Sequence, residues 1–141
     1  MKRIVLAALG AVFGLGLLFV TPQSALAQRK APPGDGYQKV STLVQLPDFL
    51  PGLGTLYVDP ATLPAGPFLA YDRQGKLVSS IYMIPLKDMN AQKSFTDLKV
   101  ARERVDHVDI VFNAGHPGVA EPHYHMIVWY VPPDQAAKLS K

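Results

Sequence analysis

Short hydrophobic runs separated by polar turns and prolines set the pattern of this chain. Runs with the alternation or the β-branched and aromatic content typical of strands lie at residues 55–58, 68–71, 76–85 and 105–112. The second and third runs flank Asp72-Arg73-Gln74-Gly75, a polar turn that ends in glycine. Two β-rich runs around such a turn predict a β-hairpin.

The run at 105–112 alternates most clearly. Val108, Ile110 and Phe112 fall on one face of the expected strand, while His107 and Asp109 fall on the other. We therefore expect a strand whose two faces differ in polarity.

Two further strands and one helix complete the predicted fold. Residues 37–46 are rich in β-forming side chains, and residues 122–131 form the last strand, which Pro132-Pro133 ends. Residues 86–99 are more polar, but their hydrophobic side chains recur near the helical period, which predicts the one helix. Short strands, proline-rich loops and one helix favour a mainly β or α+β fold, as a small antiparallel sandwich or open barrel.

The two ends of the chain set the expected domain limits. Lys2 and Arg3 precede an uncharged, mostly hydrophobic run at residues 4–20, and Ala25-Leu26-Ala27 supplies small residues for cleavage. This pattern predicts a signal peptide over residues 1–27, with a retained membrane anchor as the alternative.

The remaining chain divides into three expected parts. Residues 28–36 contain two prolines and two glycines, and predict a flexible N-terminal segment. Residues 37–133 form a single β-rich domain, and residues 134–141 form a short C-terminal tail that we expect to fray. The predicted location is periplasmic or secreted.

Charge narrows the range of partners. The whole chain has 14 Lys and Arg against 11 Asp and Glu, a formal net charge of +3. Loss of the signal peptide removes Lys2 and Arg3 and no acidic residue, so 12 basic and 11 acidic side chains remain. Neither a polybasic run nor basic residues interleaved with aromatic ones is left, so nucleic acid is not an expected partner. Membrane contact is expected only through an uncleaved signal segment, and no protein partner is indicated.

The chain contains no cysteine, which removes several kinds of chemistry. Disulfide bonds and thiolate ligands are excluded, so any bound metal needs His, Asp or Glu ligands. The serines do not lie in a glycine-rich elbow, and neither a phosphate-binding loop nor a dinucleotide fingerprint occurs. The sequence therefore gives little support to nucleophilic catalysis or nucleotide binding.

Three of the four histidines lie close together. His123 and His125 are two residues apart at the start of the last predicted strand, so their side chains point to the same face, with Cα atoms about 6.5–7 Å apart. His116 lies in the preceding loop between Gly115 and Pro117-Gly118, and such a loop can fold its imidazole back over the strand. The three residues are therefore candidate ligands of one metal ion.

Two further side chains are weaker candidates. Glu121 is close to His123 in the sequence and could be a carboxylate ligand or a general base. His107 shares a strand face with Asp109, and this face adjoins the other histidines if the two strands pair. A lone His-x-His in a strand is also a weak motif, so the alternative is that the histidines are turn or core residues bonded to their neighbours.

The stretch from Gly118 to His125 partly resembles the first cupin motif, in which a glycine is followed by His-x-His. A cupin has five residues between the glycine and the first histidine, and this chain has four. A cupin also carries a glutamate shortly after His-x-His, where this chain has Val128 and Trp129, and a second histidine motif, which this chain lacks. We therefore do not expect a standard cupin.

Residues 109–131 more closely resemble an uncharacterised family of exported bacterial proteins. That family carries Gly-His-Pro, a short spacer and Pro-His-aromatic before an aromatic-rich strand, matched here by Gly115-His116-Pro117, Pro122-His123-Tyr124 and Trp129-Tyr130. His125 stands where members often carry Asp, and aliphatic residues replace a later histidine. The resemblance implies a secreted, β-rich domain and no established activity.

The sequence thus predicts a small exported domain with a histidine-based site for a divalent metal ion. Imidazole ligands suit Zn²⁺ or Cu²⁺ best. Three imidazoles with an open coordination position would permit hydrolytic or redox chemistry, but no feature identifies a substrate, and whether the protein is an enzyme stays open. The alternative is a non-enzymatic envelope binding or interaction module whose histidines are structural.

Overall fold

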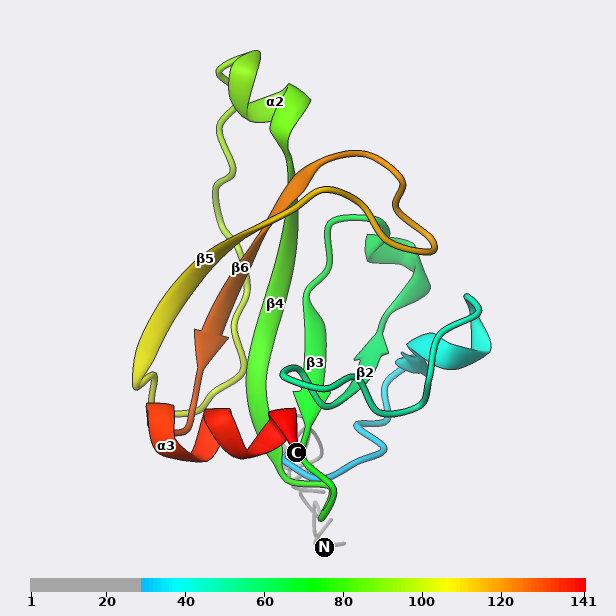
Figure 1. Cartoon of the computed structure of the whole chain (residues 1–141), viewed down its shortest axis with the longest axis vertical. Helices are drawn as coiled ribbons and strands as arrows, with labels where there is room; N and C mark the ends of the chain where they lie inside the picture. Colours follow the sequence, from blue (N-terminus) through cyan, green and yellow to red (C-terminus); the bar gives the residue numbers. More distant parts are fainter. Residues whose placement is uncertain (1–28) are drawn as a thin grey trace, which may run out of the picture.

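The structure, a computed structural model, describes residues 29–141 (Figure 1). The predicted signal peptide, residues 1–27, lies outside these residues. The described elements are, in order, β1 (Gln38–Lys39), η1 (Val40–Thr42), β2 (Thr55–Val58), η2 (Pro60–Thr62), β3 (Phe68–Tyr71), β4 (Leu77–Pro85), α2 (Leu86–Asn90), β5 (His107–Asn113), β6 (His123–Trp129), α3 (Pro133–Ala136) and η3 (Ala137–Ser140). Among the described residues, no helix has both the length and the hydrophobicity that crossing a bilayer requires.

The strands of the described region form one antiparallel sheet in the order β1-β2-β3-β4-β6-β5. β6 lies between β4 and β5, so its residues are paired on both sides. The sheet is not closed into a barrel, as the linear strand order and Figure 1 show. The predicted β-rich or α+β class is confirmed, in the form of a single open sheet with short helices at its ends.

The hairpin predicted around residues 72–75 is confirmed. β3 and β4 pair antiparallel, and the Asp72 side chain accepts hydrogen bonds from the backbone N–H groups of Gln74 and Lys76 at 2.9 and 2.8 Å. An aspartate that binds the backbone two residues ahead stabilises a tight turn. β4 then runs through the middle of the sheet with all its residues buried except Pro85, and it forms a rigid frame beside β6.

Hydrophobic side chains pack on both faces of the sheet. The larger cluster includes Val58, Phe68, Ile81, Met83, Ile127 and Trp129. The smaller cluster, on the other face, contains Leu69, Tyr71, Leu77 and Ala101. His123 and His125 alternate in step with Ile127 and Trp129, so both histidines lie on the face of the larger cluster.

The edge strand β5 leaves its hydrophobic side chains uncovered. Val108, Ile110 and Phe112 share a face as predicted, but they are 51%, 66% and 53% exposed. Among the described strands, β5 ends the order and pairs with β6 alone. The alternation therefore predicted the strand correctly, but the hydrophobic face of this strand is not buried.

Residues 37–46 do not form a continuous strand, which corrects that prediction. β1 ends at Lys39, and the chain turns at once into η1. The Thr42 hydroxyl donates to the Lys39 carbonyl at 2.7 Å, and the Ser41 hydroxyl donates to Asp48 at 2.5 Å. A local bond from a Thr side chain to the backbone, as made by Thr42, competes with strand pairing.

Of the helix predicted over residues 86–99, only α2, which ends at Asn90, is present. Gln92 and Asp97 both have φ of +56°, a left-handed conformation that does not continue a helix. The hydrophobic side chains at helical spacing therefore do not share one helical face beyond Asn90.

Both described ends contact the domain, in the regions where a flexible segment over residues 28–36 and a tail over residues 134–141 were expected. Ala31 donates to the Gly75 carbonyl at 2.9 Å, and Pro33 is fully buried. At the other end α3 and η3 place Leu139 in the larger hydrophobic cluster, and Gly52 donates to the Leu139 carbonyl at 2.9 Å. A buried side chain at each end contributes to holding these short segments against the domain.

Candidate metal centre

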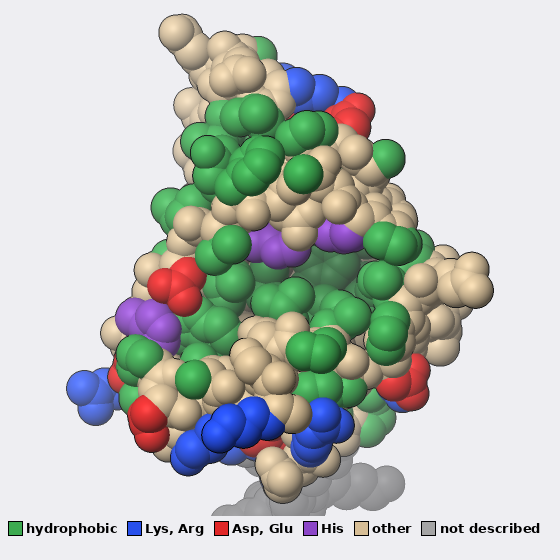
Figure 2. All heavy atoms as spheres, viewed as in Figure 1, with side chains coloured by type: hydrophobic (Ala, Val, Ile, Leu, Met, Phe, Trp, Pro, Cys, Tyr) green, Lys and Arg blue, Asp and Glu red, His purple; other side chains and the backbone are tan. Residues whose placement is uncertain are grey.

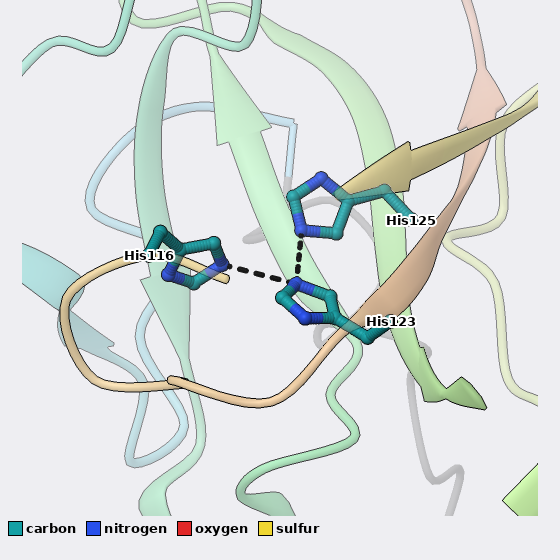
Figure 3. A group of neighbouring side chains, drawn as sticks. All are labelled: His116, His123 and His125. Atoms are coloured by element: carbon teal, nitrogen blue, oxygen red, sulfur yellow. Dashed lines mark hydrogen bonds between the residues drawn. The ribbon is translucent and has the colours of Figure 1, made fainter. Parts of the chain in front are cut away.

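The start of β6 and the loop before it bring His116, His123 and His125 together (Figure 3). The Nε2 atom of His123 lies 3.2 Å from Nε2 of His116 and 3.0 Å from Nε2 of His125. One ligand nitrogen from each residue lies within 4.8 Å of the others. In a tetrahedral site with metal–nitrogen bonds of about 2.0–2.1 Å, two ligand nitrogens are about 3.3–3.4 Å apart. The three histidines could therefore hold one metal ion.

The strand fixes two of the three imidazoles. β6 is paired on both sides over its whole length, so the backbone of His123 and His125 has little freedom. His123 has no exposed surface, and His125 is 9% exposed. Their common face follows directly from the period of two along a strand, as the spacing predicted.

A tight turn places the third imidazole. His116 and Val119 exchange backbone hydrogen bonds, each of 2.9 Å, around Pro117 and Gly118. Proline followed by a glycine with φ of +88° is the sequence that a type II turn requires. A Cβ atom on Gly118 would lie 2.9 Å from a methyl group of Val44, so the turn also packs closely against the segment before β2.

Backbone carbonyls fix the proton positions on two of the rings. Nδ1 of His123 lies 2.7 Å from the Glu121 carbonyl oxygen, and Nδ1 of His116 lies 2.9 Å from the Pro117 carbonyl oxygen. A carbonyl oxygen only accepts, so both Nδ1 atoms carry the proton and donate it. In the neutral rings both Nε2 atoms are therefore proton-free, and their lone pairs face each other across 3.2 Å. Such an arrangement favours a cation between them.

Burial keeps His125 neutral at ordinary pH. Desolvation, followed by the neighbouring His123 and His116, lowers the pKa of His125 to about 4. A metal ion binds the neutral form of imidazole, so protons compete weakly for this ring above that pH.

The Glu121 side chain lies outside the three-histidine group. Its carboxylate pairs with Lys87, with the lysine nitrogen 2.8 and 2.6 Å from the two carboxylate oxygens. Glu121 contributes through its backbone carbonyl instead, which orients His123. The sequence placed this residue at the site but could not tell which of its groups would face the histidines.

His107 also lies apart from the three histidines, although β5 and β6 pair as supposed. The register sets His107 opposite Trp129, six positions along β6 from His123, or about 20 Å. Its ring stacks on Trp129 with centroids 5.9 Å apart, and its Nδ1 and Nε2 atoms lie 2.9 and 3.8 Å from carboxylate oxygens of Asp106 and Asp109. The direction of the pairing therefore separates this histidine from the others.

The fold and part of the sequence are shared with a protein of known structure. No protein-family model matches the chain, and no curated protein matches it. The crystal structure of hypothetical protein TTHB210 from Thermus thermophilus matches with 50% sequence identity and a TM-score of 0.59, over 67% of this chain and 88% of that chain. The chain belongs to the family of that Thermus protein.

In this member of the family a hydrophobic cavity of about 350 Å³ adjoins the histidines, and the sequence did not reveal that the segment before β2 forms part of its wall. Figure 2 shows a hollow with hydrophobic side chains on its floor and histidine side chains at its upper edge. His116 and His125 line the cavity, and much of the wall comes from the segment before β2, with Leu43, Val44, Leu46, Leu50 and Leu53. Leucines three or four residues apart in a proline-containing segment were the available signal of a shared apolar face.

Proposed function

We propose that His116, His123 and His125 form a binding site for a divalent transition-metal ion, Zn²⁺ or Cu²⁺. The observation that carries this proposal is the fixed orientation of the rings. Backbone carbonyls hold the Nδ1–H groups of His116 and His123, so the Nε2 atoms of these two rings face each other without a proton, and Nε2 of His125 lies 3.0 Å from that of His123. Histidines that bind metals are characteristically oriented in this way by a hydrogen bond from the other ring nitrogen.

The ligand set favours Zn²⁺ and Cu²⁺ over harder ions. Neutral imidazole suits zinc and copper, whereas Ca²⁺ and Mg²⁺ prefer oxygen ligands. No carboxylate belongs to the described three-histidine group, because the carboxylate of Glu121 is engaged by Lys87. Three protein ligands leave a fourth tetrahedral position for water or another molecule, an arrangement typical of zinc sites that act on or bind a ligand.

We further propose that this domain works outside the cytoplasm. Support comes from the sequence alone, in the order of Lys2 and Arg3, the hydrophobic run at 4–20 and Ala25-Leu26-Ala27. Mass spectrometry of the protein from the envelope fraction tests this proposal. A chain that starts at Gln28 is expected, and an intact mass that retains residues 1–27 favours the membrane-anchored alternative.

A second candidate function is a non-enzymatic interaction module with structural histidines. The uncovered side chains of β5 favour it, because exposed hydrophobic surface often marks an interaction site. In that case the close Nε2 contacts are hydrogen bonds that share a proton rather than a metal ion.

Calorimetric titration of the metal-free protein with Zn²⁺ and Cu²⁺ separates the two candidates. We expect a stoichiometry of one ion per chain, with binding weakened at least about 100-fold in His125→Ala and in His123→Ala, since even changes around a ligand weaken binding 10–100-fold. The double variant should be little worse than either single one, because the two ligands act as a unit.

Two variants control this experiment. His116→Ala removes a partly exposed ligand in a loop, so it tests the site with little risk to the fold. His107→Ala changes a histidine that lies opposite Trp129, four positions or about 13 Å along β6 from His125, and should bind metal like the wild type. Wild-type binding no tighter than that of the His123→Ala, His125→Ala double variant would leave the interaction module as the better candidate.

A further inference from the structure

We propose that the cavity beside the three histidines binds the aliphatic chain of a medium-chain monocarboxylate, whose carboxylate takes the open position on the metal ion. This inference rests on the proposed metal site. It adds a class of ligand that no sequence feature identifies.

The cavity is hydrophobic except at one end. The strands contribute Leu56, Val58, Phe68, Ile81 and Met83 to its wall, and the segment before β2 contributes further leucines and valines. The polar side chains among the lining residues are Asn113, His116 and His125, and all three lie beside the proposed metal site, since Asn113 pairs with His123 across the sheet. A hydrophobic pocket with a few polar groups at one end orients a ligand that is itself polar at one end.

The uncompensated positive charge of the proposed metal ion favours an anionic ligand. Three neutral imidazoles leave the two positive charges of a divalent ion uncompensated, and the cavity wall contains no Asp, Glu, Lys or Arg among the described residues. An unpaired charge beside apolar surface is unfavourable, so an anionic ligand at the fourth position stabilises the ion more than a neutral one does. A carboxylate supplies that charge through an oxygen that zinc accepts at about 2.0–2.2 Å.

The approach to the metal is from this cavity. A second hollow is lined by His123 and by four charged side chains, but these charged side chains pair with one another, Lys87 with Glu121 and Lys93 with Asp88. His123 is fully buried and its Nε2 faces the other two imidazoles, and neither His116 nor His125 lines that hollow. His116 and His125 are the two imidazoles that line the apolar cavity.

The volume sets the length of the chain. Small-molecule pockets usually have volumes of about 300–1,000 Å³, so this cavity of about 350 Å³ is near the lower limit. At about 30 Å³ for each heavy atom, the share that a water molecule takes in the liquid, it has room for roughly twelve heavy atoms. Octanoate, with its eight carbons and two oxygens, fits within that space.

The test is calorimetric titration of the zinc-loaded protein with sodium butanoate, hexanoate and octanoate. We expect the affinity to rise about fourfold for each added CH₂ group, the factor that full burial of one methylene contributes. The zinc-free protein should bind octanoate at least about tenfold more weakly, and 1-octanol should bind alike with and without zinc.

Rim variants test the cavity separately from the metal. Leu63 lines the cavity and is 45% exposed, so Leu63→Glu places a charge at the rim without burying it. We expect it to weaken octanoate binding about tenfold and to leave the zinc affinity unchanged. Leu43→Glu, at another rim position that is 38% exposed, should do the same. Val100, also 45% exposed, does not line the cavity, and Val100→Glu should change neither affinity.

The possible failures can be told apart. Zinc binding together with equal affinities for butanoate and octanoate, or with octanoate affinity unaffected by zinc or by the rim variants, overturns this inference and leaves the metal site standing. Absence of zinc binding overturns both proposals.

Discussion

At the start of β6 three imidazoles face one another, whereas near its end the imidazole of His107 faces two carboxylates. The nitrogens of His107 lie near Asp106 and Asp109, and the ring is covered on one side by Trp129. In the three-histidine group the Nε2 of His123 has the Nε2 atoms of its two partners as near neighbours.

This difference shows that the groups around a histidine decide whether it is available to bind a metal ion. Each ring nitrogen of His107 already lies near a carboxylate oxygen, so these nitrogens do not need a metal ion as a partner. Nitrogens that face each other compete for a single cation, and burial keeps protons away from at least His125. Histidine side chains thus support the local structure near the end of β6 and form a candidate set of metal ligands at its start.

The largest expected effect that distinguishes the two groups is stabilisation by zinc. At a free Zn²⁺ concentration of about 100 times Kd, the free energy of unfolding should rise by about 2.7 kcal/mol, because the ion binds the native state. Urea denaturation with Zn²⁺ and with a chelator measures the increment. His107→Ala should keep it and His125→Ala should lose it; an increment that survives in His125→Ala contradicts the assignment.

A second effect concerns pH in the metal-free protein. The pKa of His125 is lowered from 6.5 to about 4, so below pH 6.5 the unfolded chain takes up a proton that the native protein refuses. The contribution to stability is therefore complete above pH 6.5 and is lost as the pH falls to about 4, by about 2–3 kcal/mol.

Comparison with His125→Gln isolates this contribution from the titration of the carboxylates. The difference in the free energy of unfolding between the two proteins should change over pH 6.5 to 4 and stay constant above pH 7. A constant difference over the whole range argues against a buried neutral His125.

A third effect belongs to the other end of β6. Asp109 accepts a hydrogen bond from Nε1 of the buried Trp129 at 2.8 Å. Asp109→Ala leaves this donor without its acceptor, so the free energy of unfolding should fall by about 1 kcal/mol, and the zinc affinity should not change. Because Trp129 is the only tryptophan, its fluorescence reports the change directly.

Asp106→Ala is the matched control for this variant. The Asp106 carboxylate lies beside His107, and the residue bonds to Trp129 through its backbone N–H, which donates to the Trp129 carbonyl. Alanine keeps that backbone donor, so the indole emission should stay as it is. An equal change of emission in both variants would show that the Asp109 hydrogen bond does not set the surroundings of the indole.

The smallest expected effect is that of His107→Ala. Its contacts with Asp106 and Asp109 are partly exposed and its ring covers only one side of Trp129, so the loss should be below about 1 kcal/mol. A larger loss in urea denaturation, or any change in zinc affinity, would show that the two ends of β6 are coupled.

The strands and the three histidines could be predicted because they depend on local patterns. The turn at Asp72, the alternation in β5 and β6, and the spacing of His123 and His125 each involve residues a few positions apart. The turn at Pro117-Gly118 was likewise local, and it positions His116. These signals are contained within short stretches of sequence and do not depend on contacts with distant segments.

The features that could not be predicted depend on contacts between segments that are distant in the sequence. The position of His107 follows from the pairing register of β5 with β6, which no short stretch encodes. The burial of Leu139 and the wall formed by Leu43 and Leu53 depend on segments that meet only in the folded chain. The turn into η1, where the Thr42 hydroxyl bonds to the Lys39 carbonyl, ends the strand in spite of the strand propensity of the neighbouring residues.

The turn that carries His116 also supplies Pro117, Gly118 and Val119 to the cavity wall. Two ligands that contact one turn need not bind independently, and thermodynamic reciprocity then governs them. The factor by which zinc tightens the binding of an aliphatic carboxylate must equal the factor by which the carboxylate tightens the binding of zinc. Scarce metal would then be retained best where the carboxylate is plentiful, and the protein would respond to the coincidence of the two rather than to either alone.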